Sequence, residues 1–271
     1  MEPVGAAPFD RIAVIGHGLI GGSIVLAVAE RLPGVQVVTL DRGDDLSAAA
    51  GADLVVLATP ISEILRLLPA LATIVASRAV VTDTGSTKSA IVNAAPAGMR
   101  FIGGHPIAGA AVPGRAAARA DLFAGRPWIL TPSVTAEPTD VAGLQHFVES
   151  PGPRAQLLAA EEHDRLFAFL SHLPQLVVSA LMDVVGCQVG EDALAMAGPG
   201  LRDTTRLATS PPDIWRDIVR TNDLQVRTAL DGLISLLTTL RDDPSGEALG
   251  ETFARAARWK SALDKMADGK W

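Results

Sequence analysis

Cysteine, excess basic charge and an N-terminal leader pattern are all scarce or missing in this sequence of 271 residues. The single cysteine, Cys187, excludes an intrachain disulfide and suits a reducing compartment. The net charge is −7 and the basic residues are scattered, so nucleic acid is not expected as the main partner. Residues 1–10 lack the basic-then-apolar pattern of a signal peptide. We therefore expect a cytoplasmic protein.

Uninterrupted apolar runs and polar low-complexity tracts are also missing. Residues such as Gly16, His17 and Pro69 interrupt the runs that approach membrane length, so no membrane span is expected. Hydrophobic residues make up 48% of the chain, and its length suits one large domain or two medium ones with a substantial core. These features predict a globular protein. We also predict a small-molecule substrate and no bound metal.

A glycine-rich loop follows the first apolar run, Arg11–Ile15, which has the character of a strand buried on both faces. The loop has the spacing G-x-G-x-x-G, and a helical stretch begins at Ser23. In this arrangement the first glycine permits a tight turn, the second lets a pyrophosphate approach the backbone, and the third lets helix pack on strand. The helix N-terminus offers free N–H groups to the phosphates. The loop residues predicted to contact a dinucleotide are Gly16, Gly18, Leu19, Ile20 and Gly21.

An acidic residue, Asp41, ends the next apolar run about twenty residues beyond Gly21. A carboxylate there hydrogen-bonds the adenine ribose and repels a 2′-phosphate, which favours NAD. Arg42 follows directly and is able instead to stack on adenine or to pair with that phosphate, so NADP stays possible. A plain turn residue is the alternative interpretation of Asp41. We predict Asp41 and Arg42 as cofactor contacts.

Strands alternate with helices through the first half of the chain, which predicts a doubly wound, mostly parallel sheet of the Rossmann type. The predicted strands are 11–15, 35–40, 54–58, 79–82, a run ending near His105, 128–131 and 155–159; the predicted helices are 23–32, 62–77, 88–95 and 139–149. Such sheets bind ligands at the carboxyl ends of their strands. The residues predicted to meet at these ends are Gly16, Asp41, Thr59, Ser86 and His105. Thr59, Pro60 and Asp83 are further predicted cofactor contacts.

His105 lies between two glycines and a proline, in a loop that another molecule can approach closely. Its imidazole titrates near neutral pH, so it is either a proton-handling group or a loop histidine with no task. Ser86 has two interpretations as well, because Ser86 or Thr87 is suited to cap the helix that starts near Lys88. Asp83 suits a turn, and together with Lys88 it is expected to support the site.

Helical patterns replace strand patterns after Glu161, which divides the chain into residues 1–160 and an all-α part, 161–271. The predicted helical stretches are 162–170, 175–185, 191–197, 213–240 and 247–266. A half of this size, rich in Leu, Ala and Val, is able to supply a homodimer interface. His163 and His172 have either a capping or a functional role, and Arg206 suits carboxylate binding or a surface ion pair with Asp203.

Five motifs occur in the order found in the prephenate/arogenate dehydrogenase family, which the chain resembles over nearly its whole length. They are Gly16–Ser23, Asp83–Lys88, Gly103–Gly109, Ser171–Pro174 and Arg202–Arg206. The resemblance implies a dinucleotide domain followed by an all-helical dimerisation domain. It also implies oxidative decarboxylation of prephenate or arogenate, with hydride transfer to NAD(P)+, in tyrosine biosynthesis.

The resemblance assigns roles to the candidate residues. His105 accepts the proton or hydrogen bond of the substrate hydroxyl, and Ser86 orients that hydroxyl, the histidine or the nicotinamide. Arg206 binds a substrate carboxylate. The full set of expected substrate-binding residues is Arg206, Gln175, His172 and His163.

Two departures from the family pattern concern the substrate. Ala110, Ala111, Val112 and Pro113 stand where many relatives have threonine and charged residues, and Gln175 replaces a second histidine of prephenate-using relatives. Arogenate and a 4-amino analogue of prephenate are therefore alternative substrates.

Two further alternatives concern the class of protein. A β-hydroxyacid type of dehydrogenase needs a catalytic lysine in the helical half, where Lys260, Lys265 and Lys270 lie too near the C-terminus. A non-catalytic dinucleotide sensor has no need to combine Ser86, His105 and Arg206.

Overall fold

The structure is a computed structural model that describes residues 8–109, 114–150 and 152–267. The substitutions noted at Ala110–Pro113, and Lys270, lie outside the described residues. The chain forms two compact units, Met1–Asp223 and Leu224–Trp271, which are described separately. The family-implied division at residue 160 lies within the first unit, at the end of its sheet, and stays a prediction.

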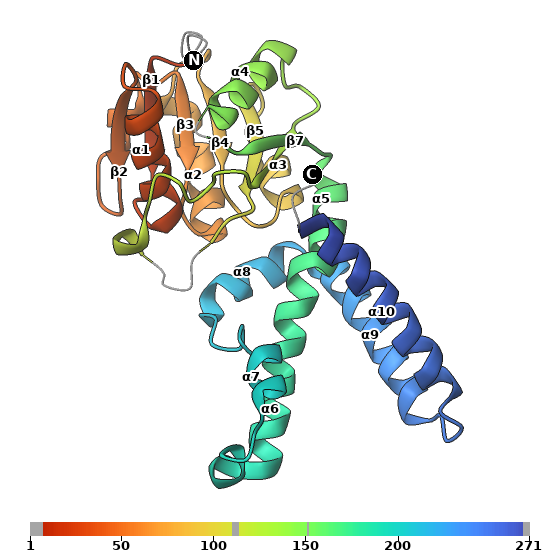
Figure 1. The fold of residues 1–271 in the computed structure, drawn as a ribbon. Coiled ribbons are helices and arrows are strands. Elements are labelled where there is room, and N and C mark those ends of the chain that lie inside the picture. Colours follow the sequence, from red (N-terminus) through yellow and green to blue (C-terminus); the bar gives the residue numbers. More distant parts are fainter. Residues whose placement is uncertain (1–7, 110–113, 151, 268–271) are drawn as a thin grey trace. The chain divides into compact units, whose positions relative to one another are not determined.

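A seven-stranded sheet organises the first unit, in the order β2-β1-β3-β4-β5-β6-β7 (Figure 1). The strands are β1 Arg11–Ile15, β2 Gln36–Leu40, β3 Leu54–Leu57, β4 Val80–Asp83, β5 Arg100–Pro106, β6 Pro127–Pro132 and β7 Arg154–Leu157. All neighbouring pairs are parallel except β5 and β6, which run antiparallel. The predicted doubly wound sheet is confirmed, and the carboxyl ends of β1 to β5 lie at one edge.

Helices pack on both faces of this sheet because its central strands are apolar on both sides. Their bounds are α1 Leu19–Arg31, α2 Ile61–Ile74, α3 Ser89–Ala94 and α4 Pro138–Glu149, with short 3-10 helices η1 Leu46–Ala49 and η2 Arg115–Ala117. Alternate β1 residues divide between two cores. Ile12 and Val14 pack in one core with residues of α1 and α4. Ala13 and Ile15 pack in the other with residues of α2 and α3.

The described chain after β7 is helical. Its elements are α5 Ala160–Phe167, the π-helical turn η3 Ala168–His172, α6 Leu173–Leu194, α7 Pro199–Thr204, α8 Pro212–Thr221, α9 Asp223–Arg241 and α10 Glu247–Ala267. The predicted continuous helix 213–240 is wrong, because the chain leaves the helical conformation at Asn222. The side chain of Asn222 bonds to the Asp164 carbonyl, which fixes the break.

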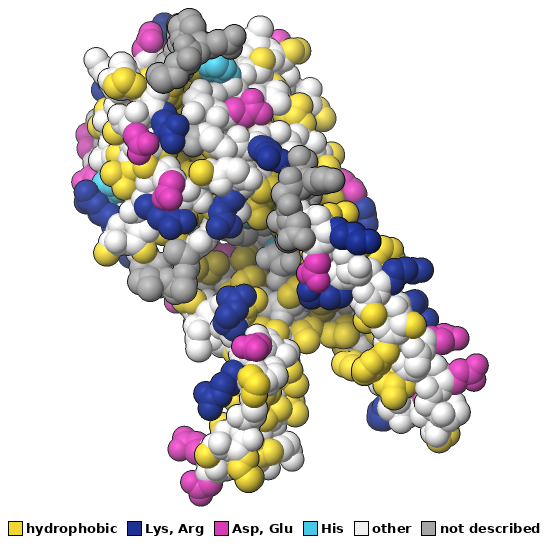
Figure 2. Space-filling model, in the orientation of Figure 1, with side chains coloured by type: hydrophobic (Ala, Val, Ile, Leu, Met, Phe, Trp, Pro, Cys, Tyr) yellow, Lys and Arg dark blue, Asp and Glu magenta, His cyan; other side chains and the backbone are white. Residues whose placement is uncertain are grey.

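The stretch Ala160–Leu194 is long and apolar enough to cross a membrane, by length and composition alone, and only 17% of its most apolar window is buried. His172, Pro174, Gln175 and Asp183 interrupt this stretch, so the finding does not contradict the expectation that no apolar run reaches membrane length uninterrupted. Residues Leu181, Val184 and Val189 of α6 are exposed. Figure 2 shows hydrophobic side chains at the surface of the helical part.

Candidate active site

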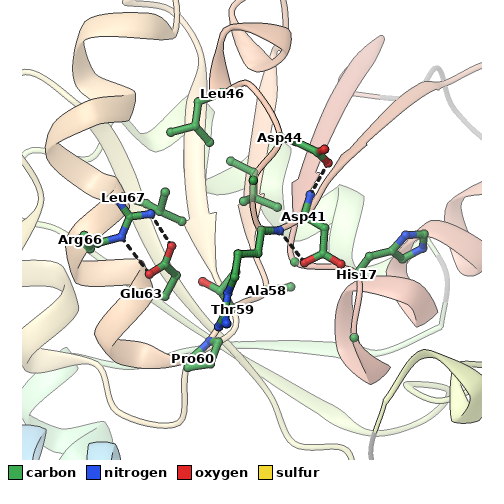
Figure 3. A pocket seen from close by; sticks show the side chains of 15 residues that line it. His17, Asp41, Asp44, Leu46, Ala58, Thr59, Pro60, Glu63, Arg66 and Leu67 are labelled. Carbon is green, nitrogen blue, oxygen red and sulfur yellow. Dashed lines mark hydrogen bonds and ion pairs between the residues drawn. The ribbon is translucent and has the colours of Figure 1, made fainter.

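A cavity of about 390 Å³ lies at the carboxyl ends of β1, β2 and β3 (Figure 3). At its floor, Gly16 has a φ of +100°, and a Cβ there would lie 2.5 Å from the Ala58 carbonyl oxygen. A Cβ on Gly21 would lie 1.9 Å from the Gly16 carbonyl oxygen, so α1 approaches β1 only because both residues are glycine. A Cβ on Gly18 would meet no atom within 4 Å, which leaves its backbone open to a ligand.

Acidic and basic side chains line the wall of this cavity after β2. The Asp41 carboxylate accepts the N–H of Arg42 at 2.8 Å, and the N–H of Asp41 bonds to Asp44 at 2.8 Å. Asp41 therefore shapes the turn and lines the cavity at once, so the two interpretations of this residue are compatible. Opposite them, Arg66 pairs with Glu63 on α2, as the dashed lines in Figure 3 show.

The cavity fits a dinucleotide on two structural grounds. Among the described residues, no side-chain cap bonds the N-terminus of α1 at Gly18, which leaves its N–H groups available to phosphate oxygens. The buried hydroxyl of Thr59 has no hydrogen-bond partner among the described residues, as expected of a group that awaits a ligand. The predicted cofactor residues that line the cavity are Gly16, Gly18, Asp41, Arg42, Thr59 and Pro60.

The other predicted cofactor residues do not line this cavity. Leu19 and Ile20 pack against the core, and Gly21 serves the contact between α1 and β1. The side chain of Asp83 is fully buried and does not line this cavity, and its contact with the cofactor stays a prediction.

Asp83 instead forms a buried ion pair with Lys88, and both side chains are 0% exposed. The pair holds the residue before His105, because Lys88 Nζ donates to the Gly104 carbonyl at 2.6 Å and Asp83 accepts the Gly104 N–H at 3.0 Å. Burial lowers the pKa of Lys88, and the Asp83 carboxylate opposes that shift. The expected supporting role of this pair matches its geometry.

His105 begins a chain of hydrogen bonds that runs into the protein. Its Nδ1 lies 2.8 Å from Nε2 of His163, and Nδ1 of His163 lies 2.9 Å from the Asp164 carboxylate. The Phe167 ring stacks on His163 at 4.4 Å and contacts His105 at 4.9 Å. His163 is fully buried with both ring nitrogens bonded, which favours a supporting role over the predicted contact with substrate.

The electrostatics of this chain keep both imidazoles neutral and the carboxylate charged. Burial, with His163, Lys88 and His172 as further causes, lowers the pKa of His105 well below 6.5. Burial also lowers the pKa of His163, against the hydrogen bond to Asp164. Burial alone would raise the pKa of Asp164, but hydrogen bonds from His163 and from two backbone N–H groups lower it overall.

Those two N–H groups belong to the start of α3. Asp164 accepts the N–H of Lys88 at 2.7 Å and that of Ser89 at 2.8 Å, so a carboxylate from α5 caps this helix. The proposed cap by Ser86 or Thr87 is therefore wrong. Thr87 bonds to Thr221, and the half-buried Ser86 hydroxyl makes no hydrogen bond within the described chain, which leaves it available to a ligand.

His172 presents a second imidazole with an unused nitrogen. It lies in the π-helical turn, is 1% exposed, and its Nδ1 lies 3.3 Å from Nδ2 of Asn222. Its Nε2 is buried and unpartnered in the described part of the chain. Burial lowers the pKa of His172 to about 4, with Asp164 and His163 as opposing smaller influences. The geometry suits the predicted contact with substrate.

Gln175 does not have a free amide. Its Nε2 donates to Ser179 and to the Leu207 carbonyl at 2.9 Å, and its Oε1 accepts from Ser210. These bonds use the amide to fix the turn after α7, which favours a structural role for Gln175 over the predicted contact with substrate. That turn carries Arg206, which is exposed and has no ion pair with Asp203 in the described residues.

Two residues of the site, Asp164 and Asn222, were missed by sequence reasoning. Asp164 follows His163 directly in the sequence, and nothing in that position indicates that its carboxylate caps α3. Asn222 lay within a predicted helix. Within the described chain, no group of three His, Cys, Asp or Glu side chains is placed to hold a metal ion.

Comparison with known families gives two matches that together span most of the chain. Residues 19–157 match the family described as "Prephenate dehydrogenase, nucleotide-binding domain". Residues 159–252 match the one described as "Prephenate dehydrogenase, dimerization domain".

Individual proteins show the same similarity. The prephenate dehydrogenase of Bacillus subtilis is 31% identical over 96% of this chain and 78% of its own length. The cyclohexadienyl dehydrogenase of Zymomonas mobilis is 30% identical over 94% of this chain and 96% of its own length. Among solved structures, Synechocystis arogenate dehydrogenase is 30% identical with a TM-score of 0.81, over 94% and 99% of the two chains. The structure of prephenate dehydrogenase from A. aeolicus, in complex with hydroxyphenyl propionate and NAD+, is 26% identical with a TM-score of 0.85. The match covers 95% of this chain and 98% of that one.

Proposed function

Because the chain belongs to the prephenate dehydrogenase family, we propose that it catalyses oxidative decarboxylation of prephenate or its close analogue arogenate. The cofactor is NAD+, and the product belongs to tyrosine or related aromatic amino acid biosynthesis. The observation that carries this function is His105, a half-buried imidazole on β5, at the same edge of the sheet as the strand ends that form the dinucleotide cavity.

The reaction removes a hydride from C4 of the cyclohexadiene ring and carbon dioxide from C1. The proton of the C4 hydroxyl is taken up by a base during the oxidation and returns to the same oxygen when the ring becomes aromatic. Aromatisation of the ring supplies the driving force. When bound, NAD+ supplies the hydride acceptor. The protein has to hold the substrate in a reactive orientation, receive the hydroxyl proton and neutralise the carboxylates.

Our assignment of residues to these tasks follows from their free groups. His105 accepts the hydroxyl proton through Nε2, the ring nitrogen that bonds to no described residue. The free hydroxyl of Ser86, which follows the neighbouring strand β4, orients the reacting groups. The unpartnered Nε2 of His172 donates to a substrate oxygen, and the exposed guanidinium of Arg206 binds a carboxylate.

We further propose that the helical part forms a homodimer and that the protein is cytoplasmic. The family description of residues 159–252 is a dimerization domain, and the exposed apolar residues of α6 fall within it. A dimer interface accounts for the apolar character of Ala160–Leu194 without a membrane. We place the boundary of the cofactor domain near residue 160, where the sheet has ended.

The test is NADH formation by purified protein with prephenate, arogenate and the 4-amino analogue, each with NAD+ and with NADP+. We expect turnover with prephenate or arogenate and a higher kcat/KM for NAD+. Turnover with only the 4-amino analogue would identify the alternative substrate. A protein that binds NAD+ but reduces it with none of the three would be the dinucleotide sensor.

A further inference from the structure

The hydrogen-bond chain behind His105 has one consistent arrangement of protons. Asp164 is an acceptor for two backbone N–H groups, and these bonds hold its carboxylate in place at the start of α3. A carboxylate has no proton to donate, so the nitrogen of His163 that faces it, Nδ1, carries a hydrogen. A neutral His163 then presents an unprotonated Nε2 to its other neighbour.

That neighbour is Nδ1 of His105, 2.8 Å away. Because Nε2 of His163 is an acceptor, Nδ1 of His105 has to be the donor. The neutral ring of His105 therefore has its lone pair on Nε2, the nitrogen left for the substrate. If the His105 proton were on Nε2 instead, the lone pair of its Nδ1 would face the lone pair on Nε2 of His163. Moving the proton of His163 to Nε2 as well would place the lone pair of its Nδ1 against the Asp164 carboxylate.

We propose that Asp164 and His163 are positioning residues that fix the tautomer of His105, so that its Nε2 accepts the hydroxyl proton of the substrate. This inference rests on the proposed function for the identity of the substrate, but the tautomer is a property of the protein alone. Neither residue has a polar atom left for the substrate, because both ring nitrogens of His163 and both carboxylate oxygens of Asp164 are already hydrogen-bonded.

Proton transfer strengthens the same bonds. When Nε2 of His105 takes the hydroxyl proton, the ring becomes an imidazolium whose Nδ1–H donates to His163. The positive charge then faces an imidazole that is itself polarised by the Asp164 carboxylate. The chain has the logic of a catalytic triad, with a second histidine inserted between the carboxylate and the base.

The same carboxylate joins two parts of the site. Asp164 comes from α5, whereas the helix that it caps, α3, follows the turn with Ser86 and begins beside Lys88. Asn222 donates to the Asp164 carbonyl at 2.8 Å and thereby links α5 to the end of α8. A shift of α5 would therefore displace His163 and the start of α3 together.

Two substitutions at His163 separate the tautomer from simple packing. Glutamine in His163→Gln retains an acceptor oxygen for Nδ1 of His105 and an N–H group for Asp164. Leucine in His163→Leu fills the site but offers no acceptor. His146, exposed on α4, is the control position and should tolerate both changes.

The experiment combines nitrogen NMR of histidine with steady-state kinetics. The chain has five histidines, so in protein labelled with 15N-histidine each ring can be assigned from single-residue variants. We expect the wild-type His105 ring to be protonated at Nδ1, the same state in His163→Gln, and loss of that state in His163→Leu. The kcat of His163→Leu should fall by about 10²–10⁴-fold, as for a base in the wrong tautomer, with His163→Gln within about tenfold of wild type.

Two results would overturn the proposal. One is a wild-type His105 ring protonated at Nε2, which is read without substrate and holds even if His163→Leu fails to fold. The other is a folded His163→Leu protein with wild-type kcat. NAD+ affinity should be unchanged in both variants. Absence of turnover in the wild-type enzyme, with the expected NMR spectrum, would refute the proposed function and leave the tautomer assignment intact.

Discussion

Replacing Lys88 with methionine would leave the Asp83 carboxylate buried without its cationic partner. Both side chains of this pair are fully buried in the structure. Loss of one member of a buried ion pair costs about 3–5 kcal/mol, because the remaining charge is neither solvated nor neutralised. The Gly104 carbonyl would lose its bond to Nζ as well, so the backbone before His105 would also be released.

The assay is urea unfolding of Lys88→Met beside a matched control at an exposed lysine. Lys260 pairs with Asp264 on α10, where the two side chains are 67% and 60% exposed, and an exposed pair of this kind contributes little. We expect the free energy of unfolding of Lys88→Met to fall by most of that cost of about 3–5 kcal/mol, and that of Lys260→Met to equal the wild-type value. A loss below about 1 kcal/mol for Lys88→Met would refute the reasoning.

A double substitution tests whether the uncompensated charge is the cause. Asp83→Asn in the Lys88→Met background removes the buried carboxylate and should recover part of the lost stability. A double variant no more stable than Lys88→Met would mean that packing, rather than charge, dominates. Turnover should fall in Lys88→Met. In the double variant it should recover to a smaller extent than the free energy of unfolding does, because this variant still lacks the ammonium group that bonds to the Gly104 carbonyl.

Three further predictions concern the cofactor and pH. Asp41→Ala should lower the preference for NAD+ over NADP+ by about tenfold or more, measured as the ratio of kcat/KM values, since a charged hydrogen-bond acceptor for the ribose is lost; an unchanged ratio would place the ribose elsewhere. Gly18→Ala should raise the KM for NAD+ without lowering the melting temperature. Gly16→Ala should lower the melting temperature, because Gly16 has a φ of +100° and its new Cβ would lie 2.5 Å from the Ala58 carbonyl oxygen. Equal melting temperatures of the two variants would contradict the geometry. The pKa of His172 falls from 6.5 in the unfolded chain to about 4 in the folded protein, so between these pH values the unfolded chain binds one more proton than the folded one. Protonation of this group should therefore lower the free energy of unfolding by up to about 3 kcal/mol as the pH falls from 6.5 towards 4. His172→Asn should show a weaker decline in urea titrations over this range, and an identical decline would show that His172 is not the group responsible.

The sheet and its ligand-binding edge were predictable from the sequence because their signals are local. Four-to-six-residue apolar runs predicted the strands, and the glycine spacing predicted the contact between α1 and β1 that the clash at Gly21 explains. The strand ends at Gly16 and Asp41 line one cavity, as expected of a parallel sheet.

The interior of the site was not predictable, because its contacts join residues far apart in sequence. Nothing near Asp164 shows that it caps a helix 75 residues earlier, and nothing near Gln175 shows that its amide is used by Leu207 and Ser210. His163 was assigned to the substrate on resemblance, but only the fold reveals that it lies behind His105. Burial, which decides whether a polar group meets a ligand or another residue, depends on tertiary packing.

The central claim is that this chain oxidises and decarboxylates its substrate in one reaction, with His105 as the proton acceptor. The most direct measurement is the amount of NADH and of carbon dioxide formed from prephenate or arogenate by the wild-type protein and by His105→Ala. We predict equal amounts of the two products from the wild type, and nearly none from His105→Ala with NAD+ affinity close to wild type. NADH without carbon dioxide, or full turnover by His105→Ala, would contradict the account.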